Sequence, residues 1–250
     1  MSLIARDQKH NWHPYTQMKT AGPPLPVVRG SGANLYLEDG RTLIDAVSSW
    51  WVTVHGHAHP EVAAAIGRQA MELEQVIFAG CTHPPAVELA ERLAAKLPPK
   101  ISRIFYSDNG STAVEVALKM AWQYWQNKGE QRHKILALEE AYHGDTFGAM
   151  SVSGRSVFTK AFEPLLFEVA HLPSPGAVPV EKVMEVLERE CANDDVVAMI
   201  VEPLVQGAGG MMMYSPETLD RMTEYCREKE QEIESRNRSN DDLPHHSKCR

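Results

Sequence analysis

The sequence predicts an α/β fold in which helices cover both faces of a parallel or mixed sheet, with a small antiparallel meander in front of it. Two observations support this prediction. After residue 101, apolar segments of strand length alternate with amphipathic helical segments, which is typical of parallel sheets buried between helices. Before residue 47, three short β-prone segments are separated by glycine-containing turns, which is typical of antiparallel hairpins.

The meander is expected to have a tight turn at Asp39-Gly40, because this dipeptide favours the backbone angles of hairpin turns. Two helices are expected after it, each with proline near the first turn and apolar residues spaced by three or four. The expected strands are 27–28, 34–37, 42–44 and an apolar segment at 51–54, and the expected helices are 60–72 and 84–97.

The second part of the chain is expected to hold the parallel sheet. The expected strands are 101–107, 134–138 and 196–201, the expected helices are 111–127, 180–191 and 216–228, and 144–152 has a mixed pattern. After residue 228 aliphatic residues are scarce, which predicts a frayed helix extension followed by disorder. We therefore divide the chain into an N-terminal segment 1–47, a partial α/β domain 48–228 and a divergent tail 229–250.

The bulk properties exclude several classes of protein. A net charge of −8 without any Lys/Arg-rich block argues against a general nucleic-acid binder. No apolar run has the length of a signal peptide core or a membrane span, so a cytoplasmic protein is expected. The four cysteines are widely spaced, which indicates reduced thiols rather than a disulfide or zinc framework.

The turn Asp108-Asn109-Gly110-Ser111-Thr112 lies between an expected strand and an expected helix. Free backbone N–H groups and the positive helix end would form an anion site there, with hydroxyl donors from Ser111 and Thr112. The same turn fits a simple helix cap, in which Asp108 or Asn109 bonds to the first helical turn. The residues alone leave both interpretations open.

Two further loops are expected at the carboxyl ends of strands, where open α/β sheets bind ligands. Tyr142, in the loop after 134–138, is placed either to stack on a flat cofactor ring or to half-cover the core. Glu202 and Gln206 follow 196–201 and would either face the same site or belong to a solvated loop.

Aromatic and histidine residues gather in the N-terminal part of the chain. Tyr15 belongs to one aromatic group, and Trp50 and Trp51 form another. Adjacent tryptophans cannot both point into one core from a strand, so one is expected to face a pocket or an interface, although a structural role is equally compatible. The alternating histidines are His55, His57 and His59. They favour a metal site only weakly, because no later strand supplies a matching ligand.

Taken together, the order and spacing of these motifs resemble the class III, fold type I aminotransferases. The resemblance extends from about His10 to Arg227 and implies an incomplete large domain of the fold type I class, dependent on pyridoxal 5'-phosphate (PLP). The motifs that carry it are His13-Pro14-Tyr15-Thr16, Ser48-Ser49-Trp50-Trp51-Val52, Gly110-Ser111 with Ala113 to Met120, Tyr142 to Ser151, and Ile200 to Tyr214.

The resemblance implies roles for residues around the cofactor. Gly110 and Ser111 would hold the cofactor phosphate, which agrees with the helix-end argument. Tyr142 would stack near the pyridoxal ring and border the substrate. Glu202 would lie near the ring as a supporting polar group.

The resemblance also implies two substrates and a partner. Trp50 and Trp51 would line the pocket for 8-amino-7-oxononanoate, the amino acceptor. Tyr15 would contact this acceptor and also the adenine of S-adenosylmethionine, the amino donor. Members of the family are homodimers, so a second copy of the chain, or a full-length relative, is the expected partner.

Three groups that the resemblance implies have no counterpart in the sequence: the aspartate that pairs with the pyridine nitrogen, the Schiff-base lysine, and the arginine that binds the substrate carboxylate. Lys119, in an expected helix, and Lys134, at the start of an expected strand, fit surface positions better. No catalytic residue is therefore identifiable, and we expect a truncated form with little or no activity. The alternatives are a non-catalytic subunit paired with a full-length relative and, less favoured, a metal-dependent hydrolase.

Overall fold

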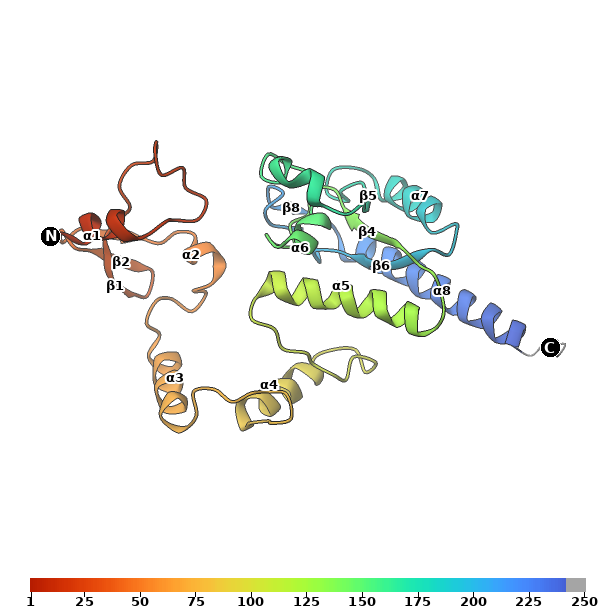
Figure 1. The fold of residues 1–250 in the computed structure, drawn as a ribbon, viewed down its shortest axis with the longest axis horizontal. Coiled ribbons are helices and arrows are strands. Elements are labelled where there is room, and N and C mark those ends of the chain that lie inside the picture. The colour runs from red at the N-terminus through yellow and green to blue at the C-terminus, as the bar shows by residue number, and fades with distance from the viewer. Residues whose placement is uncertain (242–250) are drawn as a thin grey trace, which may run out of the picture. The chain divides into compact units, whose positions relative to one another are not determined.

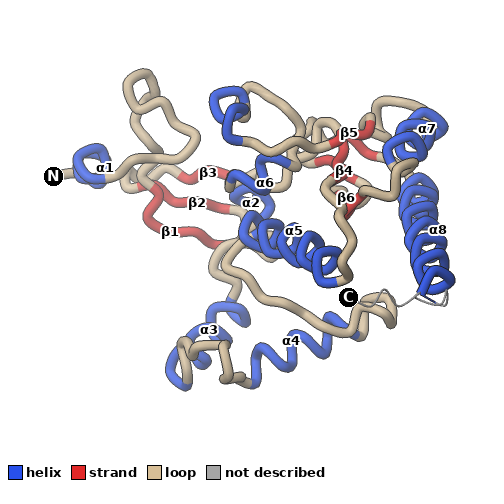
Figure 2. The backbone as a smooth tube through the Cα atoms, turned by 45° about the vertical axis from the view of Figure 1, so that its right-hand side comes forward, coloured by secondary structure: helices blue, strands red, loops and turns tan. Residues whose placement is uncertain are grey.

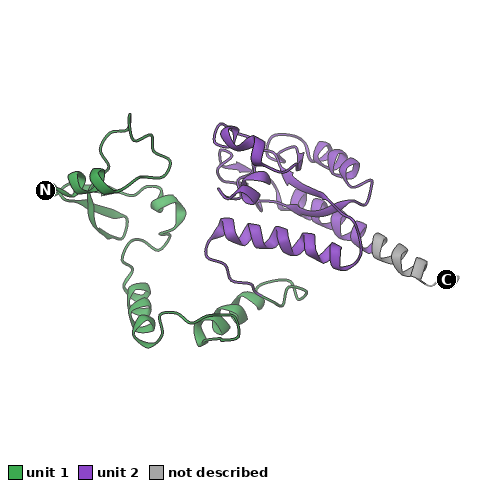
Figure 3. Cartoon of the chain, in the orientation of Figure 1, with its two compact units in different colours: residues 1–103 green, residues 104–250 purple. Residues whose placement is uncertain are grey.

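The computed structural model describes the backbone of residues 1–241 and the side chains of residues 1–231. The chain forms two compact units, Met1–Arg103 and Ile104–Arg250, called here the N-terminal unit and the sheet unit (Figure 3). Their boundary differs from the one placed at residues 47/48 from the sequence. The change of pattern at residue 47 marks the switch from strands to helices rather than the end of a compact unit.

The N-terminal unit contains the expected meander, in which three strands pair antiparallel in the order β1-β2-β3 (Figures 1 and 2). In its turn, Gly40 has a φ of 89°, and the Leu37 N–H donates to the Arg41 carbonyl at 2.9 Å. The predicted meander and its Asp39-Gly40 turn are therefore confirmed. The bounds are β1 Val27–Ser31, β2 Asn34–Leu37 and β3 Thr42–Ile44.

Four helical segments complete the N-terminal unit: α1 Leu3–His10, α2 Ser48–Trp51, α3 Pro60–Glu72 and α4 Pro84–Ala94. The predicted helices at α3 and α4 are confirmed, and each begins at a proline, whose fixed φ suits the first helical position. The strand expected at 51–54 is wrong, because the chain there leaves α2 through a turn. The sequence did not predict α1, which Ser2 caps by accepting from the Ala5 N–H at 3.3 Å.

The sheet unit is built on three parallel strands in the order β5-β4-β6 (Figure 1). A two-stranded antiparallel pair, β7-β8, follows the third strand. The bounds are α5 Gly110–Asn127, β4 Lys134–Leu138, α6 Phe147–Ser151, the 3-10 helix η1 Lys160–Leu165, β5 Ala170–Leu172, α7 Val180–Glu190, β6 Val196–Ile200, β7 Val205–Gln206, β8 Met212–Met213 and α8 Pro216–Asp241.

Successive residues of β4 face opposite sides of the sheet, as the pleat of a strand requires. Ile135 and Ala137 pack with Trp125 of α5 on one side. Leu136 and Leu138 pack on the other side, in the cluster that contains the buried residues of α7 and α8. The predicted parallel sheet with helices on both faces is therefore confirmed.

The strand expected at 101–107 is wrong. This segment is not a strand, and its apolar side chains Ile101 and Phe105 are exposed. The sequence also missed β5, which has three residues and a histidine at its centre. α8 continues as helix into the tail as far as Asp241, and residues 242–250, where disorder was predicted, lie outside the described residues. No helix in the described part combines the length and apolar character of a membrane span.

Candidate functional site

The N-terminus of α5 is closed by a capping box. Asn109 Oδ1 accepts a hydrogen bond from the Thr112 N–H at 3.0 Å, and Thr112 Oγ1 accepts one from the Asn109 N–H at 3.1 Å. The Thr112 hydroxyl also donates to the Asn109 carbonyl at 3.0 Å. The Thr112 hydroxyl is thus used inside the cap, and it is not the anion donor that the sequence suggested.

The cap leaves the first two amides of α5, those of Gly110 and Ser111, for a partner outside the helix. The first N–H groups of a helix have no acceptor within it, and the side-chain cap takes that of Thr112. Two such N–H groups at the positive end of an 18-residue helix form the kind of position that binds phosphate. The cap and the anion site are compatible because they use different residues.

The loop after β4 packs directly on Ser111. The Asp145 N–H donates to Ser111 Oγ at 3.2 Å, which uses the hydroxyl as an acceptor and leaves its proton as a donor. Gly144 permits this approach, because its φ is 132° and a Cβ there would lie 2.1 Å from Ser111 Oγ. A larger residue at this position must displace either the loop or the helix end.

Tyr142 is held at both ends by hydrogen bonds. Its backbone N–H donates to Glu202 Oε1 at 2.9 Å, and its hydroxyl donates to Asp145 Oδ2 at 2.8 Å. The residue remains 44% exposed, so its orientation depends on these bonds rather than on core packing. The ring is thereby tied to Asp145, whose backbone N–H bonds to Ser111 Oγ, and an exposed aromatic ring suits contact with a flat ligand.

Glu202 joins the loops that follow β4 and β6. Its Oε1 accepts from Tyr142, and its Oε2 accepts from the Gly207 N–H at 3.0 Å. Because β4 and β6 are adjacent and parallel, these loops meet at the carboxyl edge of the sheet. Gln206 does not face the site, contrary to expectation: it is fully buried and donates to the Glu139 carbonyl at 2.7 Å.

His143 is a site neighbour that the sequence did not single out, although it follows Tyr142 directly. Its backbone N–H donates to Ser153 Oγ at 2.9 Å. Burial lowers the pKa of its ring, and the nearby Glu202 charge opposes this more weakly. The ring is therefore neutral at neutral pH and adds no positive charge beside Tyr142.

In the N-terminal unit, the structure brings two of the predicted substrate residues together. The rings of Tyr15 and Trp50 meet edge to face, with centroids 5.3 Å apart and planes at 68°. Both residues are 64% exposed and Trp51 is 60% exposed, so none of them fills a core within this unit. All three have positive φ: 51° for Tyr15, 58° for Trp50 and 65° for Trp51.

The alternating histidines take separate partners. His57 Nε2 lies 2.8 Å from Asp45 Oδ2, whereas the rings of His55 and His59 face each other edge-on at 6.1 Å. Within the described part of the chain, no group of three or more His, Cys, Asp or Glu side chains is arranged to hold a metal ion.

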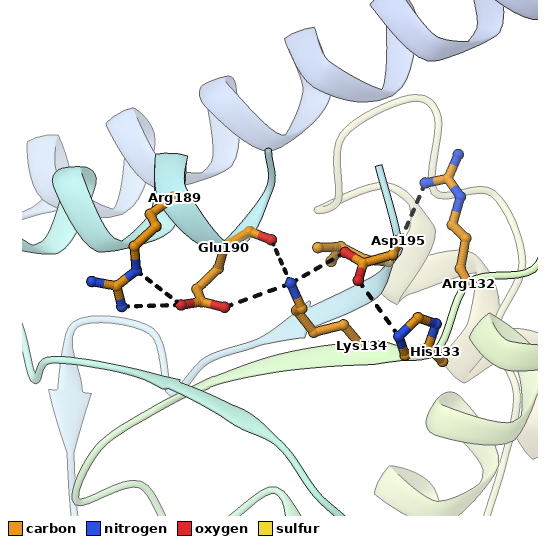
Figure 4. Close-up of polar contacts among 7 residues, drawn as sticks. Arg132, His133, Lys134, Arg189, Glu190 and Asp195 are labelled. Carbon is orange, nitrogen blue, oxygen red and sulfur yellow. Dashed lines mark hydrogen bonds and ion pairs between the residues drawn. The ribbon is translucent and has the colours of Figure 1, made fainter. Parts of the chain in front are cut away.

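Lys134 and Lys119, the two lysines considered from the sequence, do not lie in the first turn of α5. Lys134 Nζ donates to the Glu190 carbonyl at 2.9 Å and lies 3.2 Å from Asp195 Oδ1 (Figure 4). Lys134 begins β4, so this network lies at the amino end of the sheet, opposite to Tyr142. Lys119 is exposed on α5.

The model of the class-III aminotransferase family matches residues 15–232, most of the chain. The chain therefore belongs to the class-III aminotransferases, which are PLP-dependent transferases.

Several relatives share one particular name. The adenosylmethionine-8-amino-7-oxononanoate aminotransferase of Synechococcus elongatus is 55% identical over 221 residues, which cover 85% of this chain and 52% of that protein. The enzyme of the same name from Geobacter sulfurreducens is 40% identical over 237 residues, which cover 88% of this chain and 52% of that protein. The crystal structure of the enzyme so named from Methanocaldococcus jannaschii matches with a TM-score of 0.85 and 35% identity, over 91% of this chain and 52% of that one. The chain thus spans about half the length of the relatives it matches.

Proposed function

We propose that this chain supplies the phosphate-binding and substrate-binding residues of an aminotransferase that moves an amino group from S-adenosylmethionine to 8-amino-7-oxononanoate, giving 7,8-diaminononanoate. The names of the relatives support the choice of substrates. The observation that carries the proposal is the helix end at Ser111, approached by Gly144 and bordered by Tyr142.

Gly110 and Ser111 would hold the cofactor phosphate through two backbone N–H groups and one hydroxyl proton. Tyr142 would cover one face of the ring, kept in place by its bonds to Glu202 and Asp145. PLP, when bound, supplies an electron sink for the carbon that gains or loses the amino group. Glu202 acts here through the backbone of the Tyr142 loop and does not itself need to touch the ring.

Tyr15, Trp50 and Trp51 would form the apolar walls for the two substrates. Their exposure within the N-terminal unit fits side chains that are kept available for a ligand rather than used in a core. An edge-to-face aromatic pair such as Tyr15 and Trp50 also offers a flat surface to an adenine ring.

Phosphate recognition can be tested without turnover. Pyridoxamine phosphate has no aldehyde to react with surface lysines, and its binding to the purified chain is measured by calorimetry and by 31P NMR. We expect it to bind more tightly than pyridoxamine, and we expect Ser111→Ala to weaken its binding about tenfold through loss of a hydrogen bond to a charged group. Ser102→Ala, an exposed serine outside this helix end, is the matched control. Equal binding of the two ligands would overturn the proposal.

Assembly is the second part of the proposal. We propose that the chain pairs with a second copy or with a full-length relative. The N-terminal unit exposes large apolar side chains, for example Ile44 at 75% and Val52 at 78%, and exposed apolar surface is often buried in an interface. Sedimentation analysis at several concentrations, alone and mixed with a full-length relative, tests this. A monomer in both experiments would contradict it.

A further inference from the structure

The segment α2 is a left-handed turn built from residues that resist this conformation. Ser48, Ser49, Trp50 and Trp51 have φ of 47°, 48°, 58° and 65°, and none of them is glycine. A left-handed helical backbone brings Cβ of an L-residue close to the following carbonyl oxygen. Such strain persists only where surrounding contacts over-determine the backbone, and it is common at ligand sites.

The contacts that hold the turn converge on Asp45. Its Oδ1 accepts from the Ser49 N–H at 3.0 Å, and its Oδ2 accepts from the Ser49 hydroxyl at 2.7 Å. The same Oδ2 lies 2.8 Å from His57 Nε2. The Asp45 and His57 side chains are only 6% and 18% exposed. We call these three residues, Asp45, Ser49 and His57, the Asp45 clamp.

The clamp is anchored to the meander through His57. The backbone of His57 forms an antiparallel bridge with Gly32, with N–O distances of 2.8 and 3.0 Å. The imidazole lies against Gly30, where an added Cβ would come within 2.8 Å of His57 Cβ. The backbone that carries this imidazole is therefore held by the meander, and the side chain packs against Gly30.

The turn itself presents Trp50 and Trp51 without support from a core. Both are mostly exposed, and Trp50 meets Tyr15 edge to face. Their direction is therefore set by the backbone of α2 rather than by packing around the indoles. Whatever fixes that backbone also fixes where the two rings point.

We propose that Asp45 and His57 are positioning residues that hold α2 in its left-handed form and thereby set the placement of Trp50 and Trp51. The link to substrate selection rests on the proposed function, because it assumes that these indoles line the acceptor pocket. The conformational claim does not depend on it. The two hydrogen bonds from Ser49 and the bond to His57 also lower the pKa of Asp45 to about 2, so the carboxylate accepts all three bonds at neutral pH.

Fluorine NMR of the chain labelled with 5-fluorotryptophan tests this directly. The chain has five tryptophans, and Trp50→Phe and Trp51→Phe identify the two signals of the turn. Asp45→Asn keeps the shape of the side chain but cannot accept three hydrogen bonds. We expect it to shift or broaden the Trp50 and Trp51 signals and leave those of Trp12, Trp122 and Trp125 unchanged.

Amide hydrogen exchange gives a second readout, and we expect Asp45→Asn to accelerate exchange of the Ser49 amide at least tenfold. Asp39→Asn is the matched control, because Asp39 is another carboxylate of the meander that bonds to Arg41 at 2.8 Å. His57→Gln restores a nitrogen donor near the Nε2 position and should retain the native signals, whereas His57→Ala should not.

Two results would overturn the proposal. One is that Asp45→Asn leaves the Trp50 and Trp51 signals and the Ser49 exchange as in the native chain. The other is that all five tryptophan signals change together, which would show a general loss of structure rather than a local role. Because no cofactor or substrate is present, a failure of pyridoxamine phosphate binding would leave this result unaffected, and the two proposals fail separately.

Discussion

Different interactions stabilise the interior of each of the two units. In the sheet unit, Leu136, Leu138, Leu172 and Leu187 are completely buried. In the described residues of the N-terminal unit, the buried hydrophobic side chains are Leu37 and Ala86. The N-terminal unit relies instead on turns, caps and hydrogen bonds such as those of the Asp45 clamp.

The comparison shows how each unit meets its task. The sheet unit buries apolar side chains in a core and places polar groups and Tyr142 in the loops at the carboxyl ends of its strands. The N-terminal unit keeps Tyr15, Trp50 and Trp51 available by fixing their backbone with local hydrogen bonds. Burial therefore fixes the proposed phosphate-binding residues of the sheet unit, and hydrogen bonding fixes the proposed substrate-binding residues of the N-terminal unit.

Truncating a side chain should lower the free energy of unfolding far more in the core of the sheet unit than in the N-terminal unit. Leu136→Ala removes a fully buried side chain of β4, and such changes lower the free energy of unfolding by about 2–5 kcal/mol. Ile66→Ala in α3, at a position that is 65% exposed, should change it by less than about 0.5 kcal/mol. Urea-dependent hydrogen exchange, read for the peptides of β4 and α3, measures both. Equal effects would remove the distinction between the units.

The free cysteines should show the same contrast in reactivity. Burial, together with the neighbouring Cys191, raises the pKa of Cys226 from 9.0 to about 12, so its thiolate fraction at pH 8 falls about a thousandfold. Cys81 of the N-terminal unit is exposed. We expect iodoacetamide to label Cys81 far faster than Cys226, as read peptide by peptide by mass spectrometry. Comparable rates would show that the α8 face of the sheet unit opens readily.

Gly144→Ala tests the close approach of the loop to α5. The added Cβ would meet Ser111 Oγ at 2.1 Å, and the residue has a φ of 132°, so the loop must move. We expect affinity for pyridoxamine phosphate to fall about tenfold, because the Ser111 hydroxyl and Tyr142 shift together. Gly22→Ala, where an added Cβ meets nothing within 4 Å, serves as the control. Unchanged affinity in Gly144→Ala would place the phosphate elsewhere.

Periodicity predicted the parts of the fold that depend on burial. The strand at 134–138 lies in the core as expected, because successive residues such as Ile135 and Leu136 pack against helices on opposite faces, and the strand at 196–201 packs against the same clusters while partly buried. The segment 101–107 (Ile-Ser-Arg-Ile-Phe-Tyr-Ser) was also expected to be a strand, but it has no strand partner among the described residues. Composition indicates whether a segment tends to be buried, but it does not indicate whether a neighbouring strand is present to pair with it.

The site was predictable where local sequence fixes geometry and not where tertiary contacts do. The start of α5 at Asp108 to Thr112 was predicted because such residues are typical of helix N-termini, but the sequence left open whether the turn only caps the helix or also binds an anion. The roles of Asn109 and Thr112 within the cap needed the structure. The left-handed turn at Trp50 could not be predicted, because Ser-Ser-Trp-Trp contains no glycine and its conformation is imposed by Asp45 and His57.

The smallest effect is expected in a helix of the N-terminal unit. Gly67 lies inside α3, has ordinary helical φ, and an added Cβ there meets nothing within 4 Å. Gly67→Ala should stabilise the helix by about 0.5–1 kcal/mol, because alanine loses less backbone entropy than glycine on folding. Hydrogen exchange of α3 should slow by roughly two- to fivefold, while β4 exchange stays unchanged, since the effect is local. If β4 responds equally, the two units unfold as one, and the contrast drawn between burial and local hydrogen bonding applies only to their native contacts.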